Sequence, residues 1–205
     1  MESIDFNQQL NQSFENLNEF FREIASLLKD CDRLMGEEGF ITFNGNTAVY
    51  EQSRSLLNPE AWIPSYFSRA YVLEQDVEEK FPNHILFISL FLRYDGGCKD
   101  IKMKDNVPLI VSGIIVPHEP KSFKFEGWLS KKWFWVDKSE ENNILNEDIS
   151  ELRSFLEIPS GNYNNSKSIL TFAYPLEKVK STMYLKQNII KKLLDSARKL
   201  KDTSM

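Results

Sequence analysis

Two apolar runs, ILFISLFLRY at residues 85–94 and VPLIVSGIIV at residues 107–116, decide the fold of this chain. Each has the length of a strand and is rich in the branched and aromatic residues that strands favour. Because apolar side chains occupy both sides of each run, we expect both faces of the resulting sheet to be covered. The polar segment 95–106, with its Gly96-Gly97 pair, is expected to be the loop that joins the two strands.

Amphipathic helices are predicted at both ends of the chain. From Leu10 to Met35 apolar residues recur at alternating spacings of four and three, which marks one face of a long helix, and Gly36 and Gly39 offer places to end it. From 183 to 200 a second stripe of Leu, Ile and Ala faces a row of lysines. The first stripe fits either packing on the chain's own sheet, which we favour, or self-association as a coiled coil.

Shorter elements are expected between these helices and the central strands. Asn44-Gly45 is a preferred pair for a tight turn, so residues 40–43 and 46–50 are predicted to pair as a hairpin. Residues 65–75 fit a strand or a short helix, and we favour the strand. Residues 127–137 and 168–174 are predicted to be strands. The segment 142–161 has Leu145, Ile149, Leu152 and Leu156 at helical spacing, which predicts a helix that ends before Pro159-Ser160-Gly161.

This order of elements predicts an α+β fold. Strands grouped together between terminal helices are typical of a mostly antiparallel sheet that is flanked by the long N- and C-terminal helices. No linker rich in Pro, Gly and Ser divides the chain and no repeat is found, so residues 1–205 are expected to form a single domain. Its parts are an N-terminal helix at about 8–36, a sheet region at about 39–175 and a C-terminal helix at about 182–201.

Composition limits where the protein works and what it binds. The chain has 205 residues with 41% hydrophobic and 27% charged content, which is typical of a globular protein. A net charge of -5 argues against general capture of nucleic acid, and a core strand explains the Trp133 and Trp135 region better than a nucleic-acid surface does. Two distant cysteines, no signal-like N-terminus and no apolar run long enough to cross a bilayer predict a cytoplasmic protein without membrane contact.

No short catalytic or metal-binding motif appears in the sequence. The phosphate-binding glycine loops, the G-x-S-x-G elbow and the H-E-x-x-H pair are all missing. The only histidines and cysteines, His84, His118, Cys31 and Cys98, are too far apart in sequence to suggest a zinc site. We therefore predict no catalytic residue, no metal and no cofactor.

Small and polar residues in the middle of the predicted strands are candidates for a ligand pocket. Ser89, Ser112 and Thr171 interrupt otherwise apolar strands, and Arg93 ends one of them, where it could meet an anionic group. Such positions also suit close packing of a helix on the sheet, and that interpretation is favoured.

The first helix offers a candidate interface. A helix of about 26 residues reaches about 40 Å, more than a short strand can cover, so Leu10, Phe14 and Leu17 are expected to extend past the sheet. The leading hypothesis is a non-catalytic module that binds a protein partner, a second copy of itself or a small ligand. The alternative is a metal-dependent phosphodiesterase or nuclease built from scattered carboxylates, with Glu126 and Lys131 or Lys132 as its nearest candidates.

Overall fold

The computed structural model describes residues 5–43, 45–50, 52, 54–57, 59–64, 66–78, 84–92, 108–117, 152–157 and 166–203. Its centre is a six-stranded sheet with the spatial order β1-β2-β3-β4-β6-β5. The strands are β1 (Phe40–Thr42), β2 (Tyr66–Leu73), β3 (Ile85–Phe91), β4 (Leu109–Pro117), β5 (Leu152–Glu157) and β6 (Ser166–Pro175). Every pair of neighbouring strands is antiparallel.

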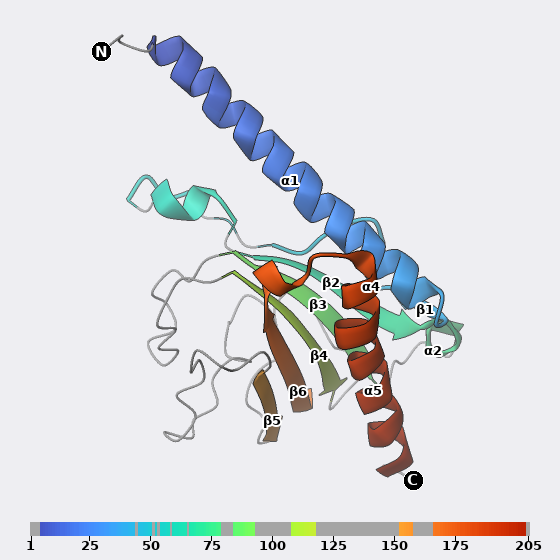
Figure 1. Cartoon of the computed structure of the whole chain (residues 1–205). Coiled ribbons are helices and arrows are strands. Elements are labelled where there is room, and N and C mark those ends of the chain that lie inside the picture. Colours follow the sequence, from blue (N-terminus) through green and yellow to red (C-terminus); the bar gives the residue numbers. More distant parts are fainter. Residues whose placement is uncertain are drawn as a thin grey trace.

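Helices stand at both ends of the described chain (Figure 1). The long helix α1 (Phe6–Gly36) is capped by Asp5, whose carboxylate accepts from the Asn7 amide, and it ends at Gly36, the first of the two predicted end points. The C-terminal helix is continuous through α4 (Thr182–Tyr184), the π-helical segment η5 (Leu185–Ile190) and α5 (Lys191–Thr203). Single turns η1 (Pro59–Trp62) and η4 (Leu176–Lys178) and the short helix α2 (Glu74–Glu78) complete the described elements.

Both long helices pack on the same face of the sheet, where they form the main core (Figure 1). In β3 that face carries Leu86, Ile88 and Leu90, and their cross-strand partners in β4 are Ile114, Ser112 and Ile110. The helices and the other strands complete this core with Ile24, Leu28, Cys31, Leu34, Met35, Tyr71, Leu170, Phe172, Tyr174, Leu185, Ile189, Ile190, Leu193 and Leu194.

The opposite face of the central strands is also buried, as the two-sided apolar pattern predicts. In β3 it carries Ile85, Phe87, Ser89 and Phe91. Gly113 in β4 lies directly across from Phe87, and a Cβ at Gly113 would stand 2.6 Å from that ring. The glycine therefore makes room for an aromatic side chain of the neighbouring strand on the face away from the two long helices.

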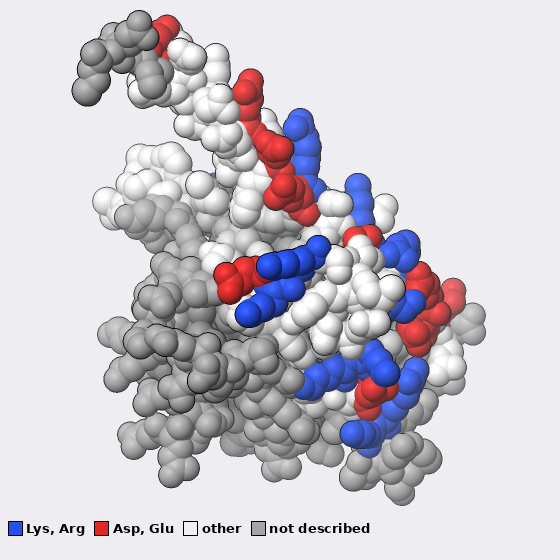
Figure 2. Space-filling view, viewed as in Figure 1, with Lys and Arg blue, Asp and Glu red and all other residues white. Residues whose placement is uncertain are grey.

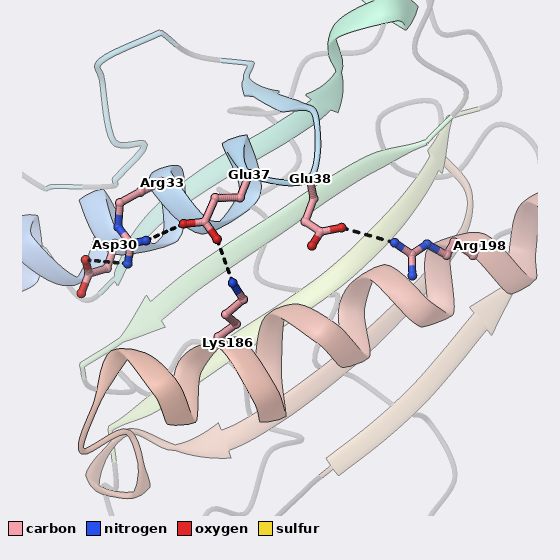
Figure 3. Close-up of polar contacts among 6 residues, drawn as sticks. All are labelled: Asp30, Arg33, Glu37, Glu38, Lys186 and Arg198. Carbon is pink, nitrogen blue, oxygen red and sulfur yellow. Dashed lines mark hydrogen bonds and ion pairs between the residues drawn. The ribbon is translucent and has the colours of Figure 1, made fainter.

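Ion pairs on the surface join the end of α1 to the C-terminal helix (Figure 3). Lys186 Nζ donates to Glu37 Oε2 at 2.8 Å, and Arg198 pairs with Glu38 at 3.3 Å. Nearby, Thr182 Oγ1 donates to Asp30 Oδ2 at 2.8 Å. These contacts place the C-terminal helix beside the last turns of α1, so it covers only that end of the long helix.

The predicted hairpin around Asn44-Gly45 is wrong. Residues of β1 pair with β2, Phe40 opposite Leu73, and Val49 bridges to Ser68 further along the same strand. Gly45 does have the positive φ of +59° that its turn requires. The chain therefore leaves the edge of β2 after β1 and returns to it at Val49. Pairing with β2 satisfies backbone groups that a separate hairpin would leave unpaired on that edge.

The predicted helix at 142–161 is wrong over residues 152–157, which form β5. β5 runs along the outer edge of β6, with Phe155 opposite Leu170. The helical spacing of Leu152 and Leu156 also fits one side of a strand, and pairing with a long neighbour overrides the local preference. Leu145 and Ile149 lie outside the described residues.

Several other fold predictions agree with the described residues. The α+β class, the antiparallel sheet, the two terminal helices and strands β2, β3, β4 and β6 are confirmed. Leu90, Ile110, Ile114 and Phe172 are buried, as core residues should be. The predicted strand at 127–137, with Trp133 and Trp135, lies outside the described residues.

Candidate functional site

Of the residues predicted to line a ligand pocket, the structure describes the side chains of Ser89 and Ser112. Ser89 and Ser112 are both buried but belong to opposite faces of the sheet. Ser89 shares a hydrogen bond with Ser68 across β2 and β3, whereas Ser112 Oγ has no described hydrogen-bond partner. Arg93 and the side chain of Thr171 lie outside what the structure describes.

The residues predicted for an interface lie on the half of α1 that extends beyond the sheet (Figure 1). We call residues 6–20 the projecting half. Phe6, Leu10 and Phe14 are 72%, 43% and 58% exposed, and Leu17 is half-buried. From Ile24 onward the same stripe is buried in the core. The helix therefore continues its apolar stripe past the end of the core that it covers.

A groove of about 550 Å³ begins where the projecting half meets the body of the protein. One wall is α1 from Leu17 to Asp32, and the other is the segment from Asn46 to Arg69. Ring contacts hold these walls in place, since Phe67 packs against Phe21 and Tyr50 with centroids 5.8 and 5.9 Å away. The lining residues are Leu17, Phe21, Ile24, Ala25, Leu28, Lys29, Asp32, Asn46, Ala48, Tyr50, Gln52, Trp62, Ile63, Pro64, Phe67 and Arg69.

The outer wall of the groove carries further exposed apolar side chains. Leu56, Leu57, Trp62 and Ile63 are all exposed. Trp62 is held by its indole Nε1, which donates to the Ser55 carbonyl at 2.9 Å, and its own carbonyl accepts from Gln52. An apolar surface therefore stands on each side of the groove mouth.

A charged cluster lies at the inner end of the groove. Arg69, only 3% exposed, donates from Nε and a terminal nitrogen to the two oxygens of Asp32 at 3.0 and 2.7 Å. Its other terminal nitrogen donates to the Thr47 carbonyl at 2.8 Å, and Tyr71 donates its hydroxyl to Asp32 at 2.9 Å. This bidentate pair ties α1, β2 and the turn segment together.

The groups beside this cluster are unsuited to nucleophilic chemistry. Burial and then the charge of Asp32 raise the pKa of the Cys31 thiol far above its usual range. Burial likewise raises the pKa of the Tyr71 hydroxyl well above its ordinary value. Both groups therefore stay protonated at neutral pH, and Cys31 acts as a small apolar core residue.

Among the described residues, no group of three or more His, Cys, Asp and Glu side chains is placed to hold a metal ion. Glu126, Lys131 and Lys132, the candidates of the nuclease hypothesis, lie outside those residues. None of the described helices is long and apolar enough to cross a membrane.

Comparison with known proteins gives no relative: no family model, curated protein or solved structure matches this chain. Any functional conclusion therefore depends on the groove and the projecting half themselves.

The groove and its charged end were missed by sequence reasoning, although one signal was present. Arg69 alternates with Phe67 and Tyr71, so it belongs to the side of β2 that faces the core. A charged residue on a core-facing side needs a partner of opposite charge. Asp32, next to Cys31 in the apolar stripe of α1, was the acid placed to meet it.

Proposed function

We propose that the protein is a non-catalytic, cytosolic binding module whose binding surface is the apolar stripe of the projecting half, Phe6, Leu10, Phe14 and Leu17. The observation that carries the proposal is the exposure of Leu10 and Phe14 in a stripe whose continuation forms the core. Exposed apolar patches of this extent usually mark an interaction site.

The length of the surface favours a protein partner. The projecting half has a length of about 22 Å at 1.5 Å per residue. A small molecule does not need an apolar helix face of that length, whereas a second helix covers it with side chains at the same three- and four-residue spacing. The occupant is therefore a helix.

The position of the charges favours a second copy of this chain. Along the projecting half, the acids Glu15 and Glu19 continue in line with Glu23, and Figure 2 shows acidic side chains in a row along α1. At helical spacing this row lies opposite the apolar stripe. The stripe is bordered instead by uncharged residues, Asn7, Gln9, Asn11, Ser13, Asn18 and Phe20.

Uncharged borders allow two identical acidic chains to meet. A symmetric dimer brings the same patch of both copies together, so charged borders of one sign would repel. Here the acids point away from the contact and the amide side chains can hydrogen-bond across it. The exposed residues Leu56, Leu57, Trp62 and Ile63 enlarge the surface towards the roughly 800 Å² per partner of a standard interface.

The cytosolic location rests on the thiol chemistry. Cys31 is buried in the core as a free thiol. A free thiol suits a reducing compartment, and this supports the proposed location.

The experiment measures mass in solution by light scattering and sedimentation. The wild type is expected to be a dimer, and Leu10→Glu with Phe14→Glu is expected to be a folded monomer, since each dimer would bury four extra carboxylates. The matched control is Gln8→Glu with Gln12→Glu, which adds the same charges at the same spacing on the far side of α1 and should remain dimeric. A wild type that is monomeric at high concentration, or a control that dissociates equally, overturns the proposal.

A further inference from the structure

The groove between α1 and the segment from Asn46 to Arg69 has a chemical character that the proposed dimer surface lacks. Its body is apolar, with Phe21, Trp62 and Phe67 among the lining residues, and its inner end is charged. A volume of about 550 Å³ falls in the range of small-molecule sites, which are mostly apolar with a few polar groups that fix orientation.

The guanidinium of Arg69 keeps unused donors at this inner end. A guanidinium has five N–H donors. Three have described acceptors, two on Asp32 and one on Thr47, and the other two have none within the described part of the chain. Because Arg69 is almost fully buried, a ligand that supplies an acceptor there gains more than it would at the surface.

The charges around the groove favour an anionic acceptor. The charged lining residues are Lys29, Asp32 and Arg69, which sum to one positive charge. The carboxylate of Asp32 is already matched by Arg69 and Tyr71, whereas Lys29 has no ion pair among the described residues. The ammonium group of Lys29 can therefore pair with an anionic group of a ligand in the groove.

We infer that this groove binds a small monocarboxylate with an apolar chain, its carboxylate facing Lys29 and the free donors of Arg69 and its chain lying along Leu17, Phe21 and Trp62. Leu17 and Trp62 border the proposed dimer surface as well, whereas Lys29 and Arg69 belong to the groove alone, and Leu10 and Phe14 do not line it. The two proposals are therefore tested by different substitutions.

The test is calorimetric titration of the full chain with dodecanoate below its micelle concentration, with dodecanol as the uncharged probe. Dodecanoate is expected to bind at one site and more tightly than dodecanol. Ala25→Phe should abolish the binding, because Ala25 lines the groove at an exposed helix position where a larger side chain fills the space without entering the core. Ser26→Phe, which adds the same ring to an exposed position outside the lining, is the matched control and should bind normally.

The charge contribution is tested by Lys29→Gln, which should weaken dodecanoate about two- to five-fold, as expected for an exposed ion pair, and leave dodecanol unchanged. Lys191→Gln, an exposed lysine outside the groove, should change neither affinity. The Leu10→Glu, Phe14→Glu variant should still bind dodecanoate. Absence of dodecanoate binding, equal affinity for dodecanol, or binding that survives Ala25→Phe overturns the inference.

Discussion

The two halves of α1 share one sequence pattern and meet different surroundings. Residues 24–35 place Ile24, Leu28, Cys31 and Met35 in the core, while residues 6–20 leave Phe6, Leu10 and Phe14 exposed. The apolar spacing continues across the boundary, although residues 6–20 hold seven Asn and Gln and residues 24–35 hold none. The periodicity of a helix thus tells where its apolar side chains lie, and the size of the sheet and the position of the C-terminal helix decide which of them are covered.

The polar residues of the two halves differ in the same way. We call residues 24–35 the packed half. There Asp32 pairs with the buried Arg69, and Asp30, together with the C-cap residue Glu37, contacts the C-terminal helix. In the projecting half, Glu15 and Glu19 are exposed on the side away from the stripe. The polar residues of one half therefore hold the fold together, whereas those of the other half are exposed to solvent.

The largest expected effect is on the free energy of unfolding, when a Leu→Ala substitution is made in each half of α1. Leu28→Ala should lower the free energy of unfolding by about 2–5 kcal/mol, because Leu28 is 5% exposed and its removal leaves a cavity. Leu10→Ala should change it by about 0.5 kcal/mol or less, since Leu10 is exposed in the monomer. Urea unfolding at low protein concentration measures both, and equal costs would contradict the division of α1 into two halves.

The next largest effect on the free energy of unfolding is expected when one acidic residue is removed from each half of α1. Asp32→Ala should cost about 3 kcal/mol, because it leaves the buried guanidinium of Arg69 without its carboxylate. Glu19→Ala, in the projecting half, should change the free energy of unfolding by about 0.5 kcal/mol or less. Thermal and urea unfolding of the two variants compare them directly, and a neutral Asp32→Ala would show that the bidentate pair does not hold the groove wall in place.

Much of this fold is predictable because its decisive segments have local signals. The two-sided apolar runs of β3 and β4 and the three-four spacing of α1 each indicate their structure without knowledge of the rest of the chain. The errors fall where distant pairing decides. Residues 40–42 and Val49 pair with β2 rather than with each other, and residues 152–157 become a strand because β6 offers an edge.

The candidate site is less predictable for the same reason. The exposed residues Leu10 and Phe14 follow from comparing a helix length with a strand length, which sequence supplies. The groove requires α1 and the segment from Asn46 to Arg69 to be placed side by side, and the pair Asp32 and Arg69 is 37 residues apart. Ser89 and Ser112 were candidates for one ligand pocket because they are polar residues in apolar strands, yet they lie on opposite faces of the sheet.

The smallest expected effect is a pH dependence that belongs to the packed half alone. The hydrogen bond from Lys186, supported by its charge and that of Arg33, lowers the pKa of Glu37 below its ordinary 4.5. A carboxyl whose pKa is lowered by folding stabilises the native state above its unfolded pKa, and that contribution disappears as the pH falls through the folded pKa. The urea midpoint of Glu37→Gln should therefore lie slightly below that of the wild type at neutral pH and converge with it as the pH falls through the lowered pKa of Glu37. Because Glu37 and Lys186 are both exposed, high salt should reduce the difference. Glu15→Gln, at an exposed acid of the projecting half without an ion pair among the described residues, should leave the urea midpoint at neutral pH unchanged, and a lowered midpoint would mean that the projecting half also carries a stabilising contact.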